Sequence, residues 1–321
     1  INSILATRFS SICTQKNLNN HIGVPLTILR IKKNHQIAVI ELGANHTGEI
    51  EFLCSIAKPT HGIITNIGKA HLEGFKNVEN IIKTKGELYH FLKENNGTIF
   101  TNKSDPVLLD LNKRYAKSVF YDSKNFDEKL KFECNPFIKI IWKKKVIQTN
   151  VIGNYNIDNI NASIAIAKHF KISEFDIAKS LQKIKFKNNR SEFIKTKFND
   201  IILDAYNANP TSMECAINNF FDIINQKKYS EYIIVLGDML ELGPEDLKHH
   251  QEIVNLLSLN KFLQCVLVGP IFIKTKYPDH FITCISNIDC EKKMKDLNLK
   301  NSLILIKGSR KMQLESIIKV L

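Results

Sequence analysis

A chain of 321 residues is too long for one typical core and predicts two domains of about 100–200 residues each. Its 44% hydrophobic and 24% charged residues exclude a disordered or fibrous protein, and no stretch approaches the roughly 18 uncharged apolar residues of a membrane span. The net charge of +13 invites a nucleic-acid hypothesis, but the lysines are spread along the chain without an arginine-rich arm, so neither a nucleic-acid partner nor membrane association is expected.

The seven cysteines are scattered, odd in number and never spaced as Cys-x-x-Cys. This pattern gives little support to a metal cluster or a disulfide framework, so the cytoplasm is the expected location. The chain starts at Ile1 without an initiator methionine or the layout of a signal peptide, and we expect it to be a fragment.

The first half of the chain alternates short apolar runs with helical patterns. A run over 37–43 predicts a buried parallel strand, and a run over 62–67 predicts another. Apolar residues at helical spacing predict a helix over 78–92, and a strand is expected over 98–101. Such alternation is typical of a mostly parallel sheet covered by helices.

The pattern changes between about 119 and 152 to short β-like runs, of which 137–142 is the clearest. A helix is expected over 157–170, and the basic segment 183–189 is the candidate linker. The first domain is therefore placed at 1–188.

A second alternation of strands and helices fills the remaining residues, 189–321. Strands are expected over 201–204, 232–236, 265–268 and 303–306, with helices over about 211–226, 246–258 and 311–321. This order predicts a Rossmann-like α/β domain, in which ligands bind at the carboxyl ends of the strands.

Three residues of the first domain could share a metal site. Glu41 follows a predicted strand, where a carboxylate can hold Mg²⁺, although a helix cap or a surface salt bridge is the alternative. Lys85 lies on the apolar stripe of its helix. Burial would lower the pKa of its amine, which could then react with carbon dioxide to form a carbamate. Alternatively, the side chain could extend along the stripe and place its amine in solvent. His71 lies in a turn-rich loop between them and could reach the same sheet edge.

Polar segments rich in asparagine lie at the start of a predicted helix and at the ends of predicted strands. Asn156 and Asn159 lie three apart at a helix entrance, where they can cap the helix or contact a base edge. The polar cluster from Asp204 to Pro210, the segment 237–243 and the segment 307–310 end strands of the second sheet and outline a crevice. The sequence contains no Walker-type phosphate loop and no Gly-x-Gly-x-x-Gly motif of dehydrogenases. It also contains no His-Glu-x-x-His motif of zinc proteases and no Gly-x-Ser-x-Gly motif of hydrolases.

Seven strings of residues, in order along nearly the whole chain, resemble the Mur ligase family. They include Asn-Leu-Asn-Asn-His-Ile-Gly-Val-Pro, Glu-Leu-Gly-Ala-Asn-His and Gly-Asp-Met-Leu-Glu-Leu-Gly, and they lie at 17–25, 41–46, 70–75, 83–87, 206–210, 237–243 and 307–310. The match is to the branch of the family that adds D-alanyl-D-alanine. The resemblance implies a central ATPase domain, which is the mostly parallel sheet with helices, followed by the Rossmann-like domain.

The activity that the resemblance implies is ATP-dependent joining of D-alanyl-D-alanine to UDP-N-acetylmuramoyl-tripeptide, through an acyl phosphate, in peptidoglycan precursor synthesis. A monomer is expected. By the same resemblance, Glu41 and His71 would hold Mg²⁺ and Lys85 would be carbamylated, so that these three are the candidate catalytic residues. ATP contacts would fall to Asn156, Asn159, Arg190 and Asp204, and substrate contacts to Asn19, Asn20, Asn207, Asn209, Lys307, Ser309 and Arg310.

The sequence also departs from the family pattern. The family's phosphate loop and UDP-binding domain would precede Ile1, so these 321 residues alone are expected to have little or no ligase activity. The alternatives are an amino-acid-adding sister ligase, whose Asp-Asn-Pro-Arg string is absent, a folylpolyglutamate synthetase, or a non-catalytic remnant. The third residue of the tripeptide is not specified by the sequence.

Overall fold

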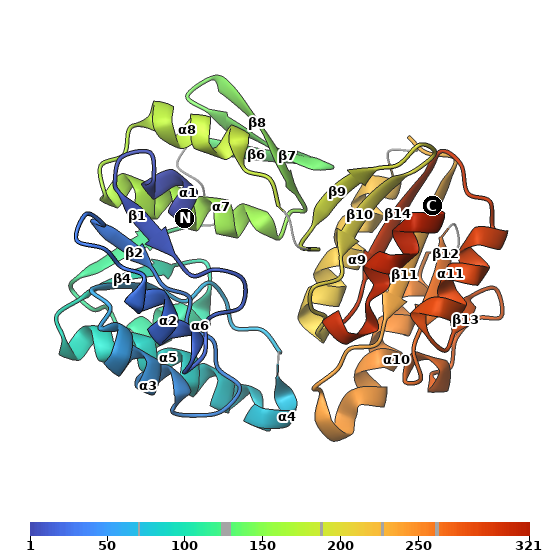
Figure 1. Ribbon diagram of the computed structural model, residues 1–321, viewed down its shortest axis with the longest axis horizontal. Coiled ribbons are helices and arrows are strands. Elements are labelled where there is room, and N and C mark those ends of the chain that lie inside the picture. The colour runs from blue at the N-terminus through green and yellow to red at the C-terminus, as the bar shows by residue number, and fades with distance from the viewer. Residues whose placement is uncertain (70, 123–129, 187–188, 226–227, 261–262) are drawn as a thin grey trace.

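The computed structural model describes residues 1–69, 71–122, 130–186, 189–225, 228–260 and 263–321. In Figure 1 the elements up to α8 (Glu174–Lys183) form one lobe, and those from β9 (Glu192–Lys195) onward form a second. Both lobes combine helices with sheets that contain parallel strands, which confirms the predicted α/β class.

In the described part of the first lobe, the strands form three short sheets. β1 (Ser11–Cys13) pairs in parallel with β2 (Ile37–Val39). Another parallel sheet has the order β3-β4-β5, with strands at His61–Ile63, Thr98–Asn102 and Ser118–Tyr121. The antiparallel sheet β6-β7-β8 follows, with strands at Leu130–Asn135, Phe137–Trp142 and Lys145–Ile152. This change of direction agrees with the change of sequence pattern.

Capping side chains mark where the helices of this lobe begin. α5 (Val78–Glu94) follows Asn77, whose side chain accepts a hydrogen bond from the backbone N–H of Asn80. α6 (Pro106–Asn112) starts with a proline after Asp105, whose carboxylate accepts from two backbone N–H groups. The other helices described in this lobe are α1 (Asn2–Leu5), α2 (Gly23–Leu29), α3 (Glu49–Ala57), α4 (Leu72–Phe75) and α7 (Asn156–His169).

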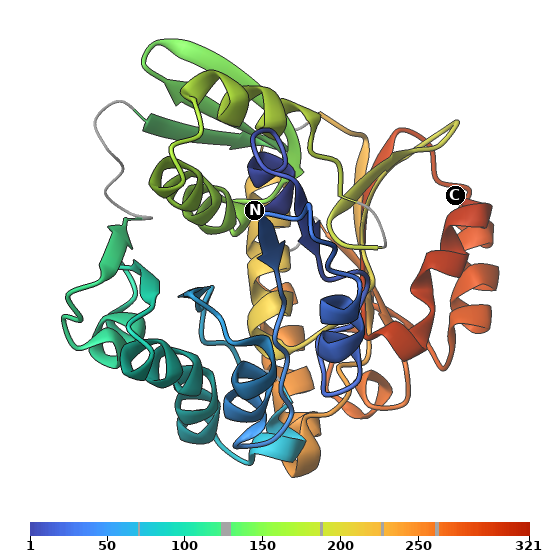
Figure 2. The same ribbon diagram turned by 60° about the vertical axis from the view of Figure 1, so that its left-hand side comes forward.

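The first helix packs against the last two helices of its lobe. Figures 1 and 2 both place α1 beside α7 and α8. Ile4 and Leu5 are buried there in the same apolar cluster as Ile177 and Leu181. The start and the end of the first 188 residues therefore share one core.

The second lobe is built on a sheet with the strand order β13-β12-β11-β14-β10-β9 across its described residues. Its further strands are β10 (Asp200–Asp204), β11 (Glu231–Gly237), β12 (Gln264–Val268), β13 (Ile282–Cys284) and β14 (Ser302–Lys307). Every pairing is parallel except that of β9 with β10. Because β10, β14 and β11 are parallel neighbours, their carboxyl ends meet at one edge, where a doubly wound sheet binds ligands.

Apolar side chains cover both faces of this sheet. Ile202, Ile234 and Leu305 belong to one buried cluster, whereas the adjacent strand residues Ile201 and Ile233 belong to another. Successive side chains of a strand point to opposite faces, so a parallel sheet covered on both sides needs near-continuous apolar runs. The covering helices are α9 (Pro210–Ile224), α10 (Asp246–Leu257) and α11 (Asn287–Asp296), with short 3₁₀ turns η1 (Gly243–Glu245) and η2 (Phe272–Lys274).

Two predicted strands of the first lobe are wrong in extent. The run over 37–43 contributes only β2 (Ile37–Val39), and this strand is half-exposed rather than buried. Ile40 and Leu42 instead pack as a loop against the apolar cluster under α2 and α3. The run over 62–67 likewise contributes only the end of β3 (His61–Ile63).

Two further expectations need correction. The helix expected over 311–321 is a pair of 3₁₀ segments, η3 (Arg310–Met312) and η4 (Leu314–Val320), because Gln313 between them is left-handed at φ +51°. The candidate linker at 183–189 starts too early, since α8 includes Lys183; residues 187–188 lie outside the described residues. The short edge strands β9 and β13 were not expected.

Within the described residues, no helix is both long enough and apolar enough to cross a membrane.

Candidate functional site

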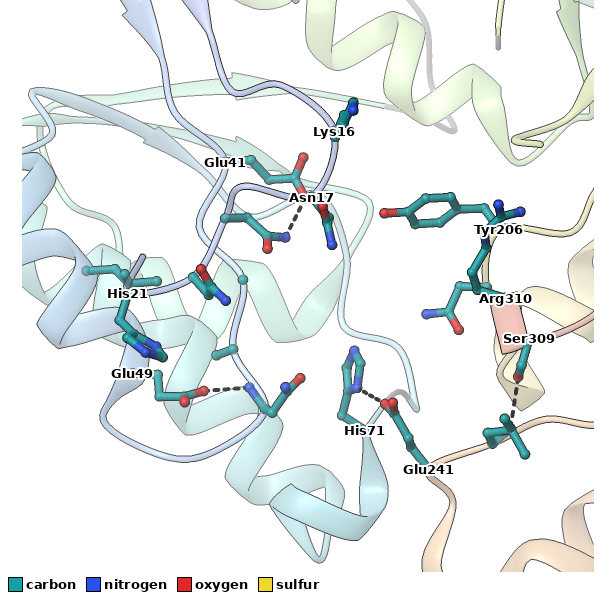
Figure 3. Close-up of a pocket in the computed structure, with 18 of the residues that line it drawn as sticks. Lys16, Asn17, His21, Glu41, Glu49, His71, Tyr206, Glu241, Ser309 and Arg310 are labelled. Carbon is teal, nitrogen blue, oxygen red and sulfur yellow. Dashed lines mark hydrogen bonds and ion pairs between the residues drawn. The ribbon is translucent and has the colours of Figure 1, made fainter. Parts of the chain in front are cut away.

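A cavity of about 1490 Å³ lies between the two lobes and is lined by residues of both (Figure 3). The first lobe contributes residues around 16–21 and 41–53 together with His71. The second lobe contributes residues at 189–190, 206–207, 240–241 and 309–315. These segments include the edge of the second sheet at which its topology predicts a ligand.

Glu41 and Asn19 form the centre of the first-lobe wall. The side-chain nitrogen Nδ2 of Asn19 donates to Oε1 of Glu41 over 2.9 Å, while the backbone N–H of Glu41 donates to Thr14 over 2.8 Å. Gly43 leaves room for this contact, because a Cβ there would lie 2.6 Å from Nδ2 of Asn19 and the amide would have to shift. Glu41 is exposed in the cavity. Its carboxylate is oriented by an amide and remains accessible to a ligand.

Carboxylates also shape the loop beside Glu41. Oε2 of Glu49 accepts hydrogen bonds from the backbone N–H groups of Asn45 and His46, at 2.6 and 2.9 Å. The two oxygens of Glu87, on α5, accept from Gly48 and Glu51 at 2.9 Å each. The residues of 83–87 that resemble the family motif thus support this wall from behind. In the same region, the side chain of Asn20 accepts a hydrogen bond from the N–H of Gly23, the first residue of α2, over 2.9 Å.

His71 belongs to the first lobe and contacts the second lobe at the cavity. Its Nδ1 lies 2.6 Å from Oε2 of Glu241, which follows β11 (Figure 3). His71 is left-handed, at φ +54°, and is the N-cap residue of α4. The structure therefore brings Glu41 and His71 to one cavity, but it also pairs His71 with a carboxylate for which the sequence suggested no role.

Three cationic side chains line the second-lobe wall, beside the carboxylates of Glu241 and Glu315. The guanidinium of Arg190 lies 3.8 Å from the ring centroid of Tyr206, so the aromatic face holds this cation at the cavity. Arg310 pairs with Glu315 over 2.5 Å, and Lys311 is exposed beside it. Such a wall suits a ligand that carries negative charge.

An ion pair lies at the edge of the sheet next to this wall. Nζ of Lys307 is 2.6 Å from Oδ2 of Asp204 and donates to the backbone oxygen of Asn207 over 3.1 Å. The side chain of Lys307 is only 2% exposed and that of Asp204 18% exposed. The other carboxylate oxygen of Asp204 accepts from the N–H of Ser191 over 3.1 Å. Lys307 is thus engaged by the chain itself and does not line the cavity.

A buried acid and histidine hold the loop after β11. Both oxygens of Asp238 accept backbone hydrogen bonds, from Ile271 at 3.0 Å and Phe272 at 2.9 Å. His250 accepts from the N–H of Met239 at Nε2, 2.9 Å away, and donates from Nδ1 to the oxygen of Asp246, 2.7 Å away. Burial lowers the pKa of His250 and raises that of Asp238, which is consistent with a neutral imidazole.

Lys85 lies outside the cavity lining. It is half-buried, and its Nζ donates to the backbone oxygen of Asn66 over 2.8 Å. Desolvation lowers the pKa of this amine below its usual value, which increases the neutral fraction that could react with carbon dioxide.

The remaining predicted residues are engaged within the chain. Asn156 donates to the oxygen of Ile152 over 2.8 Å and accepts from Asn159 over 3.0 Å, and neither side chain lines the cavity. Asn209 caps α9 by accepting from the N–H of Ser212 over 2.9 Å. Asn209 therefore stabilises the start of its helix. Asn156 and Asn159 do not cap α7, whose N-cap residue is Tyr155 and which has no side-chain capping bond.

Comparison with known proteins identifies the family. Residues 1–167 match the profile of the Mur ligase middle domain, and residues 189–310 match that of the Mur ligase, glutamate ligase domain. The chain belongs to the Mur ligase family. The resemblance seen in the seven strings is thereby confirmed.

Relatives within the Mur ligase family cover almost the whole chain. UDP-N-acetylmuramoyl-tripeptide–D-alanyl-D-alanine ligase of Bacillus subtilis (strain 168) is 36% identical over 332 residues, which span 99% of this chain and 71% of that protein. The structure of MurF from Acinetobacter baumannii has a TM-score of 0.85 at 27% identity and covers 99% of this chain and 72% of that one. MurF ligase from Thermotoga maritima, in complex with ADP, has a TM-score of 0.83 at 27% identity, with 99% and 74% covered.

The cavity collects most, but not all, of the residues singled out by the Mur ligase resemblance. Lining it are Asn19, Asn20, Glu41, His71, Arg190, Asn207, Ser309 and Arg310. Outside its lining are Lys85, Asn156, Asn159, Asp204, Asn209 and Lys307. Glu241 also lines the cavity although no role was expected for it; its position in the segment 237–243, just after a strand, was a usable signal.

The donors at the cavity are compatible with a magnesium ion. Among the described residues, no group of three or more His, Cys, Asp or Glu side chains is close enough to hold a metal by itself. Mg²⁺ does not need such a cage, since it usually binds one or two carboxylates together with waters and substrate phosphates. The exposed carboxylate of Glu41 fits that pattern.

Proposed function

We propose that this chain catalyses the ATP-dependent joining of D-alanyl-D-alanine to UDP-N-acetylmuramoyl-tripeptide, as part of peptidoglycan precursor synthesis. The observation that carries the proposal is the convergence, at one cavity, of the family strings that contain Asn17, Glu41, His71, Tyr206 and Leu240. Relatives named for this reaction cover 99% of the chain. The division into a central ATPase domain at 1–188 and a ligase domain at 189–321 belongs to the same proposal.

The reaction transfers the terminal phosphoryl group of ATP to the carboxylate of the tripeptide, giving an acyl phosphate and ADP. The amine of D-alanyl-D-alanine then attacks the acyl carbon, and the tetrahedral intermediate releases phosphate and a proton to leave the amide. The protein's task is positioning and charge stabilisation. Arg190 and Arg310 face the cavity from the second lobe and would stabilise the anionic groups.

Glu41 and His71 would hold Mg²⁺ at the first-lobe wall. Asn19 orients the carboxylate of Glu41, while Glu241 orients the ring of His71. When bound, the ion would neutralise part of the phosphate charge. Lys85, whose pKa burial lowers, would as a carbamate add a further anionic ligand; ¹³C-labelled carbon dioxide should then give a carbamate signal that Lys85→Arg abolishes.

ATP would be held where the lobes meet. Asp204 and Arg190 lie on the second-lobe side, whereas Asn156 and Asn159 lie at the start of α7. For the asparagines to contact adenine, the hydrogen bond between them would have to open. Asn20, Asn207 and Ser309 line the cavity and would contact the two substrates; Lys307 and Asn209 would act on them indirectly, through the ion pair and the helix cap.

The cytoplasm and a monomeric state are part of this proposal. All seven cysteines, each within a described segment, are free thiols, as expected in a reducing compartment.

The test is a ligation assay with the intact protein isolated from its source. The protein would be given ATP, Mg²⁺ and UDP-N-acetylmuramoyl-tripeptide together with D-alanyl-D-alanine, a diamino acid or glutamate, and products would be identified by mass. Product with D-alanyl-D-alanine alone supports the proposal. Product with another acceptor favours a sister ligase, and the absence of any product favours the non-catalytic alternative.

A further inference from the structure

The contact between His71 and Glu241 joins residues of different lobes. Their side chains are 32% and 56% exposed, and the nitrogen–oxygen distance is 2.6 Å. Two exposed side chains seldom hold such geometry by themselves, because both must be ordered at once. Something else must fix the two residues in place.

The segment around His71 is docked on the second lobe by contacts of its own. The backbone N–H of Glu73 donates to the oxygen of Glu241 over 3.2 Å. The N–H of Lys69 donates to Thr211, at the start of α9, over 3.2 Å. Leu72 packs against the buried core of the second lobe. These polar and apolar contacts bring the backbone beside His71 to a defined place.

The loop that carries Glu241 is equally restrained. Met239 is fully buried and donates to His250, while Leu240 donates to the hydroxyl of Ser309 over 2.9 Å. Glu241 itself is left-handed, at φ +63°, a conformation that costs energy unless its surroundings impose it. A rigid loop therefore presents the carboxylate to the ring.

The chemistry of the pair fixes the state of the ring. An ionised carboxylate can only accept, so Nδ1 of His71 must carry the hydrogen. Within the described residues, Nε2 of His71 has no hydrogen-bond partner, and in Figure 3 the ring points into the cavity. In the neutral ring, a hydrogen on Nδ1 leaves Nε2 with a lone pair that faces whatever the cavity binds.

We propose that Glu241 is a positioning residue, supplied by the second lobe, that holds His71 in the Nδ1–H form with Nε2 available to the cavity. His71 is then set for its role only when the lobes are docked, so domain arrangement and site assembly are coupled through this pair. The consequence for ligation rests on the proposed function, but the state of the ring does not.

Nitrogen NMR of the intact protein with ¹⁵N-labelled histidine tests this directly. At pH 8, without ligands, His71 should show a protonated Nδ1 and an unprotonated Nε2, with the signal assigned by its loss in His71→Gln. Glu241→Ala should shift the ring toward the Nε2–H form that free histidine favours. Glu241→Gln, which keeps an acceptor oxygen, should shift it less. Glu245→Ala, an exposed acid of the same region that pairs with Lys248, should leave His71 unchanged.

Steady-state kinetics of the same variants are the second test of the proposal. Partners that orient a metal-binding histidine typically account for roughly 10- to 100-fold in activity or metal affinity, so Glu241→Ala should lower kcat by that factor, Glu241→Gln by less and Glu245→Ala not at all. An Nε2–H ring in the wild type, or a ring unmoved by Glu241→Ala, overturns the proposal whatever the activity. A ring that shifts as expected in a protein without ligase activity supports the positioning role and rejects the proposed function.

Discussion

The two walls of the cavity are held in place in different ways. On the first-lobe wall, Glu41 and Asn20 are exposed and lie on loops. The second-lobe wall is backed by polar groups that are almost fully buried, with exposures of 2% for Lys307, 1% for Asp238 and 0% for His250. One wall offers ligand-binding groups to solvent, whereas the other rests on a closed polar network.

This difference separates binding from scaffolding. A satisfied network in a low-dielectric interior fixes a single geometry, and losing one member leaves another unpaired. An exposed carboxylate can instead exchange water for a cation or a phosphate-bound ion. Substitutions in the buried network behind the second wall should therefore reduce stability, and substitutions of the exposed Glu41 on the first wall should reduce activity with stability unchanged.

The largest effect is expected for Lys307→Met. It leaves Asp204 without its cation at the sheet edge, and breaking a buried pair costs about 3–5 kcal/mol of unfolding free energy, here toward the lower end because Asp204 is 18% exposed. Chemical denaturation measures this loss. Lys311→Met, which removes an exposed lysine nearby, should change stability by less than about 0.5 kcal/mol. Equal effects of the two changes would contradict the scaffolding role.

Glu41→Gln should show the opposite behaviour. Replacing a residue that only orients a metal ligand lowers activity or metal affinity by about 10- to 100-fold. Loss of a direct ligand should therefore lower kcat/KM by more than about 100-fold. The unfolding free energy should change by less than about 0.5 kcal/mol, since the side chain is exposed. Glu94→Gln, on the exposed surface of α5, is the control for both measurements. A stability loss that matches the activity loss would place Glu41 among the structural residues.

A smaller effect is expected for Ser309→Ala. The hydroxyl of Ser309, a residue 4% exposed, accepts from the N–H of Leu240 over 2.9 Å and ties the loop of Glu241 to the end of β14. Removing the acceptor should cost about 1 kcal/mol in thermal or chemical unfolding. Hydrogen exchange at the Leu240 amide should become faster. An unchanged exchange rate would show that this bond does not restrain the loop.

The smallest effect concerns pH and lies in the first lobe. Burial, and then the nearby His169, lower the pKa of His61, so its proton is bound more readily in the unfolded chain. The native state is therefore fully favoured above about pH 6.5 and loses stability as the pH falls below that value. In His61→Phe, which keeps a ring beside Phe100 and Phe170, the fall in Tm between pH 7.5 and 5.5 should be smaller than in the wild type. An equal fall would exclude His61 as a contributor.

Much of the fold was accessible from the sequence because local patterns agreed with tertiary packing. The helix predicted over 78–92 is α5 (Val78–Glu94), and the strand predicted over 303–306 is β14 (Ser302–Lys307). The run over 37–43 failed because apolar residues can pack as a loop just as they pack in a strand. The segment 311–321 failed because apolar spacing alone does not reveal the left-handed break at Gln313.

The site was harder to predict from the sequence than the fold, because its key contacts join residues of different lobes. Glu241 and His71 are 170 positions apart, and only the arrangement of the lobes joins them. Lys307 looked like a substrate contact from its place after a strand, but the register opposite Asp204 pairs the two side chains with each other. For Lys85 the apolar stripe left burial and snorkelling to solvent as alternatives, and the lowered pKa of its amine agrees with burial.

Hydrogen exchange of the intact protein, with and without a non-hydrolysable ATP analogue and UDP-N-acetylmuramoyl-tripeptide, tests most directly whether the cavity between the lobes is the ligase site. Protection of both 41–51 and 306–311 on addition of the ligands is the predicted result, because these segments lie on opposite walls. Protection confined to the surface around Lys179 and Lys183, or to neither wall, would contradict the account.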